Sequence, residues 1–569
     1  MDQFCALPHG GNLVRPMASP DRARELSGLS RDIVSLSLTP RQLSDLELIL
    51  CGAFSPLPGF MGREATGSVI KSMRLPDGTL WPVPVNLEIP EKRAEKIALG
   101  DKVALRDNEG FLLAVLTVSE KFIPSLGEEA ELVYGTSDPN HPGVARLLSR
   151  AGCVALSGPL EGVQAPLHYA FRQLRHTPAE IRALFRKLGW RRAVGFHTSR
   201  PVHRAQHALT LAAMGRANAG LLLHPVAGRV RPDDMDTYAR LRCYLSLARY
   251  YPHSSMILSL LPLSMRMAGP REALFHAIVR KNYGCTHFIV GPDHAGAGRD
   301  GGGRPYYPPE AARELCQTHS RELGLEILGF DFLSYSPEKS AFAENGPNDS
   351  ADRASSEAEV AERLRRGENL PSWFSFPEVE EEIRRAHPPR STAGFTIFCT
   401  GLSGAGKSTL AKLLYARFAE EGKRPVTLLD GDIVRKNLSS ELGFSREHRD
   451  LNVHRIGFVA SEITKNRGIA ICAPIAPYRK TRREVRAGIE VYGGFIEVYV
   501  NTPLSVCEAR DVKGLYAKAR AGIIPEFTGV SDPYEPPERP EVIVDTTDMT
   551  PDEAAQEVFL YLTRAGYIR

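Results

Sequence analysis

The sequence predicts an α/β protein with parallel sheets covered by helices, and two stretches of the chain lead to this prediction. In the C-terminal third, short apolar runs alternate with helical patterns; the runs are residues 395–399, 426–430, 469–474, 495–500 and 542–545. A looser alternation precedes it, with runs at 193–196, 219–226, 256–261, 286–291 and 325–330. Strands that alternate with helices are typical of a parallel sheet with helical crossovers.

The length predicts several domains, because 569 residues exceed what one hydrophobic core usually supports. We predict a β-rich module over residues 1–165, an α/β domain over 166–335, a small segment with a linker over 336–389, and a second α/β domain over 390–569. The first module has short apolar runs separated by Gly and Pro turns. The linker contains a polar stretch at 343–358 and a Pro-Pro pair that would end the preceding helix.

Composition and charge narrow the class of protein. A hydrophobic share of 43% with 24% charged residues is typical of a globular chain and excludes wholesale disorder. A net charge of +4 gives no reason to expect a nucleic-acid partner. The nine cysteines form no C-x-x-C pair, which indicates reduced thiols without a zinc site. With no apolar leader and no run of ~18 apolar residues, we expect a soluble cytoplasmic protein with no membrane partner.

A phosphate-binding loop is predicted at residues 401–408, GLSGAGKS, which match G-x-x-x-x-G-K-[ST]. Glycines let backbone N–H groups wrap phosphate oxygens at a helix N-terminus. Lys407 is expected to reach the β- and γ-phosphates, and Ser408 to ligate Mg²⁺. A Gly-rich turn without a ligand could have the same spacing, but the flanking strand and helix favour an ATP or GTP site. The predicted loop residues are Gly401, Leu402, Ser403, Gly404, Ala405, Gly406, Lys407, Ser408 and Thr409.

Two carboxylates, Asp430 and Asp432, follow the next predicted strand. A carboxylate at this place in a kinase can orient or deprotonate an acceptor hydroxyl and help to hold Mg²⁺. The same residues could instead cap a helix after a tight turn. Spacing alone leaves both interpretations open.

Further motifs accompany the loop: LDGD at 429–432, PYR at 477–479, DVKGLY at 511–516 and FTG at 527–529. With them, residues 390–569 closely resemble adenylyl-sulfate (APS) kinases. The resemblance implies phosphorylation of the APS 3′-hydroxyl by ATP, which yields 3′-phosphoadenylyl sulfate (PAPS). It implies Asp432 as catalytic base and Mg²⁺ ligand, with Asp430 beside it. It also implies Arg510 as an ATP contact and an APS site made of Arg435, Phe444, Arg449, Asn452, Ile475, Pro477, Lys513, Leu515 and Phe527.

The residue types at this predicted APS site suit the ligand. Arginine forks match the oxygens of a phosphosulfate. Phe444 and Phe527 would sandwich the adenine, since aromatic faces stack on purines, and Lys513 and Leu515 would lie on a lid. One position departs from the pattern: Ala476 stands where many family members have a serine. A covalent route through that serine is therefore closed, while direct in-line transfer remains available.

Residues 1–386 resemble ATP sulfurylases (sulfate adenylyltransferases). The resemblance rests on segments 8–11, 46–61, 223–225, 268–273, 281–287 and 371–378. It implies a β-rich module followed by a Rossmann-like nucleotidyltransferase domain. The family adenylylates sulfate with ATP and releases pyrophosphate, so its product is the substrate of the kinase.

The sulfurylase motifs are altered in this chain. The family sequence Q-T-R-N-P-x-H-R-A-H reads HTSRPVHRAQ at 197–206, and G-R-D-H-A-G reads GPDHAG at 291–296. Two arginines and one histidine of the family pattern are thereby lost. The residues of this altered site are His197, Ser199, Arg200, His203, Gln206, Pro292 and His294.

The loss of positive charge at this site bears on whether the N-terminal region is active. The sulfurylase reaction brings the negative charges of a sulfate and a triphosphate together around one phosphorus. Removing one well-placed donor typically costs ~10²–10³ in rate. We therefore expect an APS kinase whose N-terminal region is inactive and serves as an oligomerisation or regulatory scaffold. The alternative is a bifunctional enzyme in which Arg200 or His207 replaces a lost ligand. A non-catalytic binding protein is disfavoured by the intact phosphate loop. We also expect the chain to form a homo-oligomer, namely a hexamer. Its expected partners are the small molecules ATP and APS.

Overall fold

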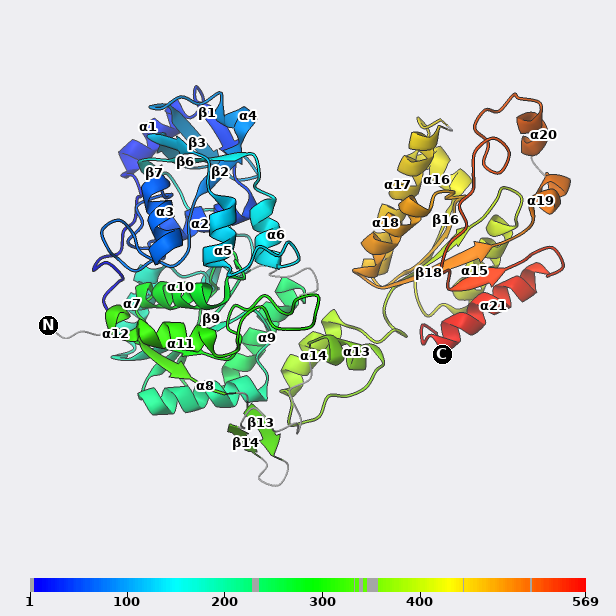
Figure 1. Ribbon diagram of the computed structural model, residues 1–569. Helices are drawn as coiled ribbons and strands as arrows, with labels where there is room; N and C mark the ends of the chain where they lie inside the picture. Colours follow the sequence, from blue (N-terminus) through cyan, green and yellow to red (C-terminus); the bar gives the residue numbers. More distant parts are fainter. Residues whose placement is uncertain are drawn as a thin grey trace. The chain divides into compact units, whose positions relative to one another are not determined.

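The computed structural model describes residues 5–227, 235–331, 333–336, 341–344, 357–443, 445–511 and 514–568. It divides the chain into two compact units (Figure 1). The first comprises residues 1–355 and 371–386, and the second comprises 356–370 and 387–569. The finer four-part division of the sequence analysis stays a prediction.

The beginning of the first unit contains two small sheets. One has the order β1-β3-β4-β7 and the other β2-β6-β5. The strands are β1 (Val34–Ser37), β2 (Leu87–Pro90), β3 (Lys102–Arg106), β4 (Leu112–Thr117), β5 (Glu120–Phe122), β6 (Cys153–Ser157) and β7 (Leu160–Gly162). The described part of 1–165 also has six helices, which the sequence analysis did not predict. They are α1 (Pro20–Leu29), α2 (Pro40–Leu50), α3 (Arg63–Ser72), α4 (Glu91–Ala94), α5 (Leu126–Val133) and α6 (Pro142–Leu148).

The rest of the first unit is built on a five-stranded parallel sheet of order β10-β9-β8-β11-β12. Its strands are β8 (Ala193–Thr198), β9 (Gly220–Pro225), β10 (Met256–Leu258), β11 (His287–Val290) and β12 (Glu326–Gly329), which confirms the five predicted runs. The helices around it are α7 (Pro178–Lys187), α8 (Arg204–Ala217), α9 (Thr237–Leu247), α10 (Gly269–Asn282), α11 (Ala311–Thr318) and α12 (Ser320–Leu323).

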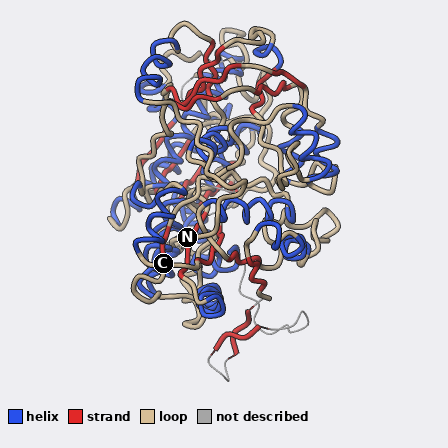
Figure 2. Tube along the Cα trace, turned by 90° about the vertical axis from the view of Figure 1, so that its left-hand side faces the viewer, coloured by secondary structure: helices blue, strands red, loops and turns tan. Residues whose placement is uncertain are grey.

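Smaller elements follow this sheet. Strands β13 (Leu333–Ser336) and β14 (Ala341–Glu344) pair antiparallel and stand away from the body of the first unit (Figures 1 and 2). Helix α14 (Pro377–Ala386) packs on α9 in the same unit, whereas α13 (Glu357–Arg365) belongs to the second unit.

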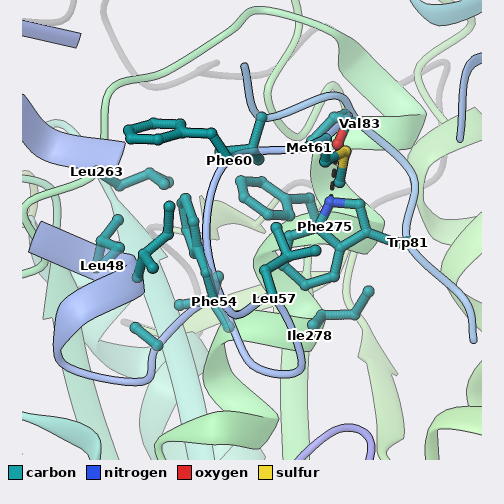
Figure 3. Close-up of a cluster of buried hydrophobic side chains, with 14 of the residues drawn as sticks. Leu48, Phe54, Leu57, Phe60, Met61, Trp81, Val83, Leu263, Phe275 and Ile278 are labelled. Atoms are coloured by element: carbon teal, nitrogen blue, oxygen red, sulfur yellow. Dashed lines mark hydrogen bonds between the residues drawn. The ribbon is translucent and has the colours of Figure 1, made fainter. Parts of the chain in front are cut away.

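One continuous hydrophobic core joins the small sheets to the parallel sheet of the first unit. At its centre Trp81, Phe54 and Phe275 pack with ring centroids 5.0–6.0 Å apart (Figure 3). The indole Nε1 of Trp81 donates to the carbonyl oxygen of Val83 at 2.8 Å, so the fully buried ring leaves no polar atom unsatisfied. Because this core crosses residue 165, the β-rich module and the α/β part fold as one unit.

The second unit has a five-stranded parallel sheet of order β16-β17-β15-β18-β19. Its strands are β15 (Phe395–Thr400), β16 (Val426–Asp430), β17 (Ile469–Ala473), β18 (Gly494–Val500) and β19 (Val542–Val544), again at the predicted runs. The helices that follow its strands are α15 (Lys407–Glu421), α16 (Gly431–Leu438), α17 (Arg446–Lys465), α18 (Arg479–Glu490), α19 (Leu504–Arg510), α20 (Leu515–Arg520) and α21 (Pro551–Arg564). None of the helices in the described ranges has the length and apolarity needed to cross a membrane.

Phe275→Ala is expected to lower the free energy of unfolding of the first unit by about 3–5 kcal/mol, because a buried aromatic ring is replaced by a cavity. The three tryptophans, Trp81, Trp190 and Trp373, all lie in this unit, so tryptophan fluorescence during urea denaturation reports on it selectively. An unchanged fluorescence midpoint would contradict the assignment of Phe275 to the core.

Candidate functional site

The carboxyl ends of the parallel strands in the second unit gather the predicted site residues. Residues 401–406 connect β15 to α15, Asp430 ends β16, and residues 474–478 follow β17. Ligands of open α/β sheets bind at this edge. The loop geometry requires glycine at Gly401, where φ is +149° and an added Cβ would lie 2.5 Å from the carbonyl oxygen of Val500.

Two side chains from later in the chain support the loop. Thr546 Oγ1 donates to the carbonyl oxygen of Ala405 at 3.0 Å, and Arg510 donates to Thr546 Oγ1 at 2.8 Å. Arg510, predicted as an ATP contact, therefore lies beside the loop. Lys407 is buried at the start of α15 and donates to the carbonyl oxygen of Leu402 at 2.6 Å, while Ser408 is exposed.

The two carboxylates lie at the end of β16 and the start of α16; in the sheet, β17 separates β16 from β15. Asp430 is 7% exposed at the end of β16. Asp432 is the second residue of α16, and its side chain lies outside the described residues. Arg435, one turn further on, donates to the carbonyl oxygens of Leu442 and Gly443 at 3.0 and 2.9 Å and so fixes the turn before α17.

A buried arginine offers the clearest anion-binding group. Arg449 Nη1 donates to Thr528 Oγ1 at 2.7 Å and pairs with Asp532 Oδ2 at 2.9 Å. Its Nε and Nη2 atoms are buried and have no hydrogen-bond partner within the described ranges, and the same holds for Oδ1 of Asn452 one turn later. Buried polar atoms without partners cost free energy, so the two donor atoms of Arg449 and the acceptor atom of Asn452 fit a ligand that pairs with them.

The segment after β17 adopts an unusual backbone conformation. Ala476 has φ +45°, in the left-handed region that alanine rarely adopts. Thr400 Oγ1 donates to the carbonyl oxygens of Ile475 at 2.7 Å and Ala476 at 3.2 Å. The carbonyl oxygen of Pro477 accepts from the N–H of Glu535 at 2.9 Å. The predicted residues Ile475 and Pro477 are thus fixed next to the phosphate loop.

The remaining predicted residues approach from the segment after β18. Phe527 packs edge-on against Tyr516, with centroids 5.1 Å apart, and Tyr516 OH donates to the carbonyl oxygen of Ser403 in the phosphate loop at 2.9 Å. Leu515 begins α20 beside them. Phe444 and Lys513 lie outside the described residues, so the predicted adenine sandwich and half of the lid remain predictions.

Sequence reasoning missed the residues that support this site. Asp532 holds Arg449 and also accepts from Tyr478 OH at 2.8 Å, and Arg482 contacts the carbonyl oxygen of Ala476. Asp532 comes five residues after Phe527 and Arg482 follows the PYR motif, so proximity in sequence was the only available signal.

In the first unit, the altered residues lie at the carboxyl ends of β8 and β11. His197 is the next-to-last residue of β8, and its Nδ1 accepts from Arg280 Nη2 at 2.6 Å. His294 Nε2 and His276 Nδ1 are 3.1 Å apart. Burial, together with neighbouring positive charge, holds the pKa of His197 and His294 well below the usual value. These imidazoles are therefore neutral at neutral pH.

The helix that follows β8 uses its polar residues for structure. Gln206 Oε1 accepts from the N–H of His203 at 3.0 Å and caps α8. His203 Nδ1 lies 2.9 Å from Ser375 Oγ, and burial lowers the pKa of His203 to about 4. His207, the predicted substitute ligand, donates through Nε2 to the carbonyl oxygen of Tyr250 at 3.2 Å.

The two positions that lose an arginine carry no charge. The carbonyl oxygen of Ser199 accepts from Arg240 Nη1 at 2.6 Å, and Pro292 follows β11 by two residues. The adjacent Arg200 has an exposed side chain, and its carbonyl oxygen accepts from Tyr244 OH at 2.7 Å. The structure therefore brings the altered residues into one region but supplies no charged side chain at the lost positions themselves.

Three imidazoles in this region come close enough to suggest a metal ion. His197, His276 and His294 each place one ring nitrogen within 4.8 Å of the others. However, the guanidinium of Arg280 donates a hydrogen bond to Nδ1 of His197. Burial lowers the pKa of Arg280 to about 9, so the guanidinium is still charged at neutral pH. A divalent cation would face this positive charge at short range, so the arrangement does not favour a metal centre.

Comparison with known proteins identifies three regions of the chain. Residues 6–165 match a PUA-like domain, residues 172–386 match ATP-sulfurylase, and residues 393–545 match adenylylsulphate kinase. Sulfate adenylyltransferases of Phaeosphaeria nodorum and Chaetomium globosum are 43% and 44% identical, with 99% of each chain covered. A solved structure described as a hexameric APS kinase from Thiobacillus denitrificans is 38% identical, covers 99% of both chains and has a TM-score of 0.80.

These matches extend over nearly the full length of the chain and agree with the two sites. The adenylylsulphate kinase match spans the phosphate loop and Arg449, and the ATP-sulfurylase match spans the five-stranded parallel sheet of the first unit, His197 and His294. The chain therefore belongs to the bifunctional ATP sulfurylase/APS kinase family.

Proposed function

We propose that the chain converts APS and ATP to PAPS and ADP, and that its sulfurylase-like region is catalytically inactive. The observation that carries the kinase half is the placement of the phosphate loop and Asp430 at the carboxyl ends of the parallel strands, together with the unpartnered buried donors of Arg449. The 3′-hydroxyl oxygen of APS attacks the γ-phosphorus of ATP. The bond from that phosphorus to the β–γ bridging oxygen breaks, and ADP leaves. Asp432 accepts the hydroxyl proton.

ATP and Mg²⁺ have a donor set of the right chemistry. Mg²⁺ prefers oxygen ligands and usually arrives with the phosphates of its nucleotide. The exposed hydroxyl of Ser408 and the carboxylates of Asp432 and Asp430 would hold it, with Lys407 on the β- and γ-phosphates. The residues that would contact ATP are Gly401, Leu402, Ser403, Gly404, Ala405, Gly406, Thr409 and Arg510.

The acceptor nucleotide would lie against the opposite wall. The unpartnered Nε and Nη2 of Arg449 would bind phosphosulfate oxygens, and Asn452 would complete its hydrogen bonds with the same ligand. The remaining contacts would come from Arg435, Phe444, Ile475, Pro477, Lys513, Leu515 and Phe527.

Loss of charge supports the inactivity of the sulfurylase-like region. Uncharged Ser199 and Pro292 stand where the family pattern has arginines, and the nearby His197 and His294 are neutral because their pKa values are lowered. Neutral imidazoles do not offset the charge of sulfate and a triphosphate. The relative from Thiobacillus denitrificans, described as an APS kinase over the same full length, agrees with this proposal.

A bifunctional enzyme is the second candidate, and the fungal relatives favour it, since they are named sulfate adenylyltransferases. In this case Arg200, with its exposed side chain, would have to turn toward the substrates. For either function we propose that the chain is cytoplasmic and forms a homo-hexamer through its N-terminal region. The relative described as hexameric supports this assembly.

Lys407→Met should lower kcat for PAPS formation from APS and ATP by at least ~10²–10³, because a fixed cation is lost from the transferred phosphate. Product formation is followed chromatographically in the full chain. Lys412→Met, on the exposed face of the same helix α15, is the matched control and should retain activity. Equal activity of both variants would contradict the role of Lys407.

Arg449→Lys should raise the KM for APS about tenfold or more while the KM for ATP stays unchanged, because lysine keeps the charge but not the planar fork. Steady-state kinetics with each substrate varied in turn measures this. If both KM values rose together, Arg449 would not be specific to the acceptor pocket.

The bifunctional alternative makes its own prediction, which is ATP formation from APS and pyrophosphate by the purified chain. We expect none above the level of a Ser199→Ala, Arg200→Ala, His207→Ala variant, measured with coupled luciferase. ATP formation that depends on Arg200 or His207 would overturn the proposed inactivity and establish the bifunctional enzyme.

A further inference from the structure

The segment that connects β17 to α18 holds a strained residue next to the phosphate loop. Ala476 has φ +45° and is 2% exposed. An L-residue other than glycine avoids this region because its Cβ crowds the backbone. Such a conformation persists only when the surrounding structure holds it in place, and it is often found at functional sites.

One buried guanidinium bonds directly to this residue. Arg482, in the first turns of α18, donates through Nη1 to the carbonyl oxygen of Ala476 at 2.7 Å and through Nη2 to that of Glu535 at 2.6 Å. Its Nε donates to Glu497 Oε1 at 2.9 Å. The Arg482 side chain is only 2% exposed. The three bonds use all three nitrogens of the guanidinium and point in three directions.

The partners of Arg482 tie separate elements to the segment. Glu497 lies on β18, and Glu535 belongs to the stretch before β19. Glu535 also forms two hydrogen bonds with residues after Ala476. Its N–H donates to the carbonyl oxygen of Pro477 at 2.9 Å, and its Oε2 accepts from the N–H of Arg479 at 2.8 Å. Thr400 at the end of β15 adds its hydroxyl to the carbonyl oxygens of Ile475 and Ala476.

We propose that Arg482 is a positioning residue for the acceptor nucleotide, because it holds Ala476 in the left-handed conformation that presents Ile475 and Pro477 to APS. This inference rests on the proposed kinase function and on the predicted contact of Ile475 and Pro477 with APS. Arg482 itself is enclosed by protein and does not touch a substrate. It acts through the backbone of Ala476.

The bonding pattern explains why arginine is required. A lysine ammonium can approach Glu497, but it cannot serve Ala476 and Glu535 at the same time along fixed directions in one plane. Glu497 also pairs with Arg486 at 3.2 Å, so its charge stays compensated when Arg482 is changed. Arg482→Lys should therefore leave the sheet folded and release mainly the 475–477 segment.

Steady-state kinetics of the full chain tests the inference. Arg482→Lys should raise the KM for APS about tenfold, with the KM for ATP within about twofold of the parent value. Arg483→Lys is the matched control: Arg483 is the next residue on α18, is largely exposed and pairs with Glu538. It should leave both KM values unchanged.

A second substitution separates positioning from general stability. Glycine adopts positive φ without strain, so Ala476→Gly removes the need for the hold. In the Arg482→Lys background, Ala476→Gly should bring the KM for APS back to within about threefold of the parent. Merely structural damage by Arg482→Lys would not be repaired by a second change that itself removes a side chain.

The outcomes are distinct. If the parent chain forms no PAPS, the proposed function fails. If the parent is active but Arg482→Lys leaves the KM for APS unchanged, or Ala476→Gly does not rescue it, the positioning role is wrong. Should Arg482→Lys fail to fold, Thr400→Val replaces it as the test, since Thr400 also donates to the carbonyl oxygen of Ala476 and donates in addition to that of Ile475. A raised KM for APS that Ala476→Gly relieves supports the inference, and an unchanged KM overturns it.

Discussion

Two polyanions can meet at one phosphorus only where fixed cations and N–H donors offset their repulsion, and the rest of the structure follows from this constraint. The second unit satisfies it at the carboxyl edge of its sheet. There the phosphate loop follows β15 and Lys407 begins α15, and two buried donor atoms of Arg449 lack a partner within the described ranges. In the first unit, uncharged residues stand at 199 and 292, and the imidazoles beside them are neutral. In the function that we propose, the same electrostatic rule accounts for catalysis in one half of the chain and for its absence in the other.

The packing of the first unit does not depend on the residues at the altered positions. The Phe54, Trp81 and Phe275 cluster joins its small sheets to its parallel sheet, and the buried Arg266 pairs with Asp45 at 2.9 Å in the same core. Residues of the former motifs have taken structural roles; Gln206, for example, caps α8. A fold retained in this way can serve assembly or regulation, since fold and activity are separable.

The sequence predicted both parallel sheets and the phosphate loop because these depend on local patterns. It missed the helices before residue 165, which are short, although Thr39 and Gln42 form a capping box that marks the start of α2. The supports of the kinase site could not be predicted, because they depend on contacts between distant residues. Asp532 pairs with Arg449, which lies 83 positions earlier in the chain. The positive φ of Ala476, whose carbonyl oxygen accepts from Arg482, has no signature in the sequence.

The central claim is that this chain phosphorylates APS but does not make it. The most direct test supplies the purified full chain with ³⁵S-labelled sulfate, ATP, Mg²⁺ and inorganic pyrophosphatase, which draws any adenylylation forward, and follows label in nucleotides. We predict no labelled APS or PAPS from sulfate, while the same preparation converts added APS to PAPS. Labelled PAPS from sulfate would contradict the account and show that the first unit retains its chemistry.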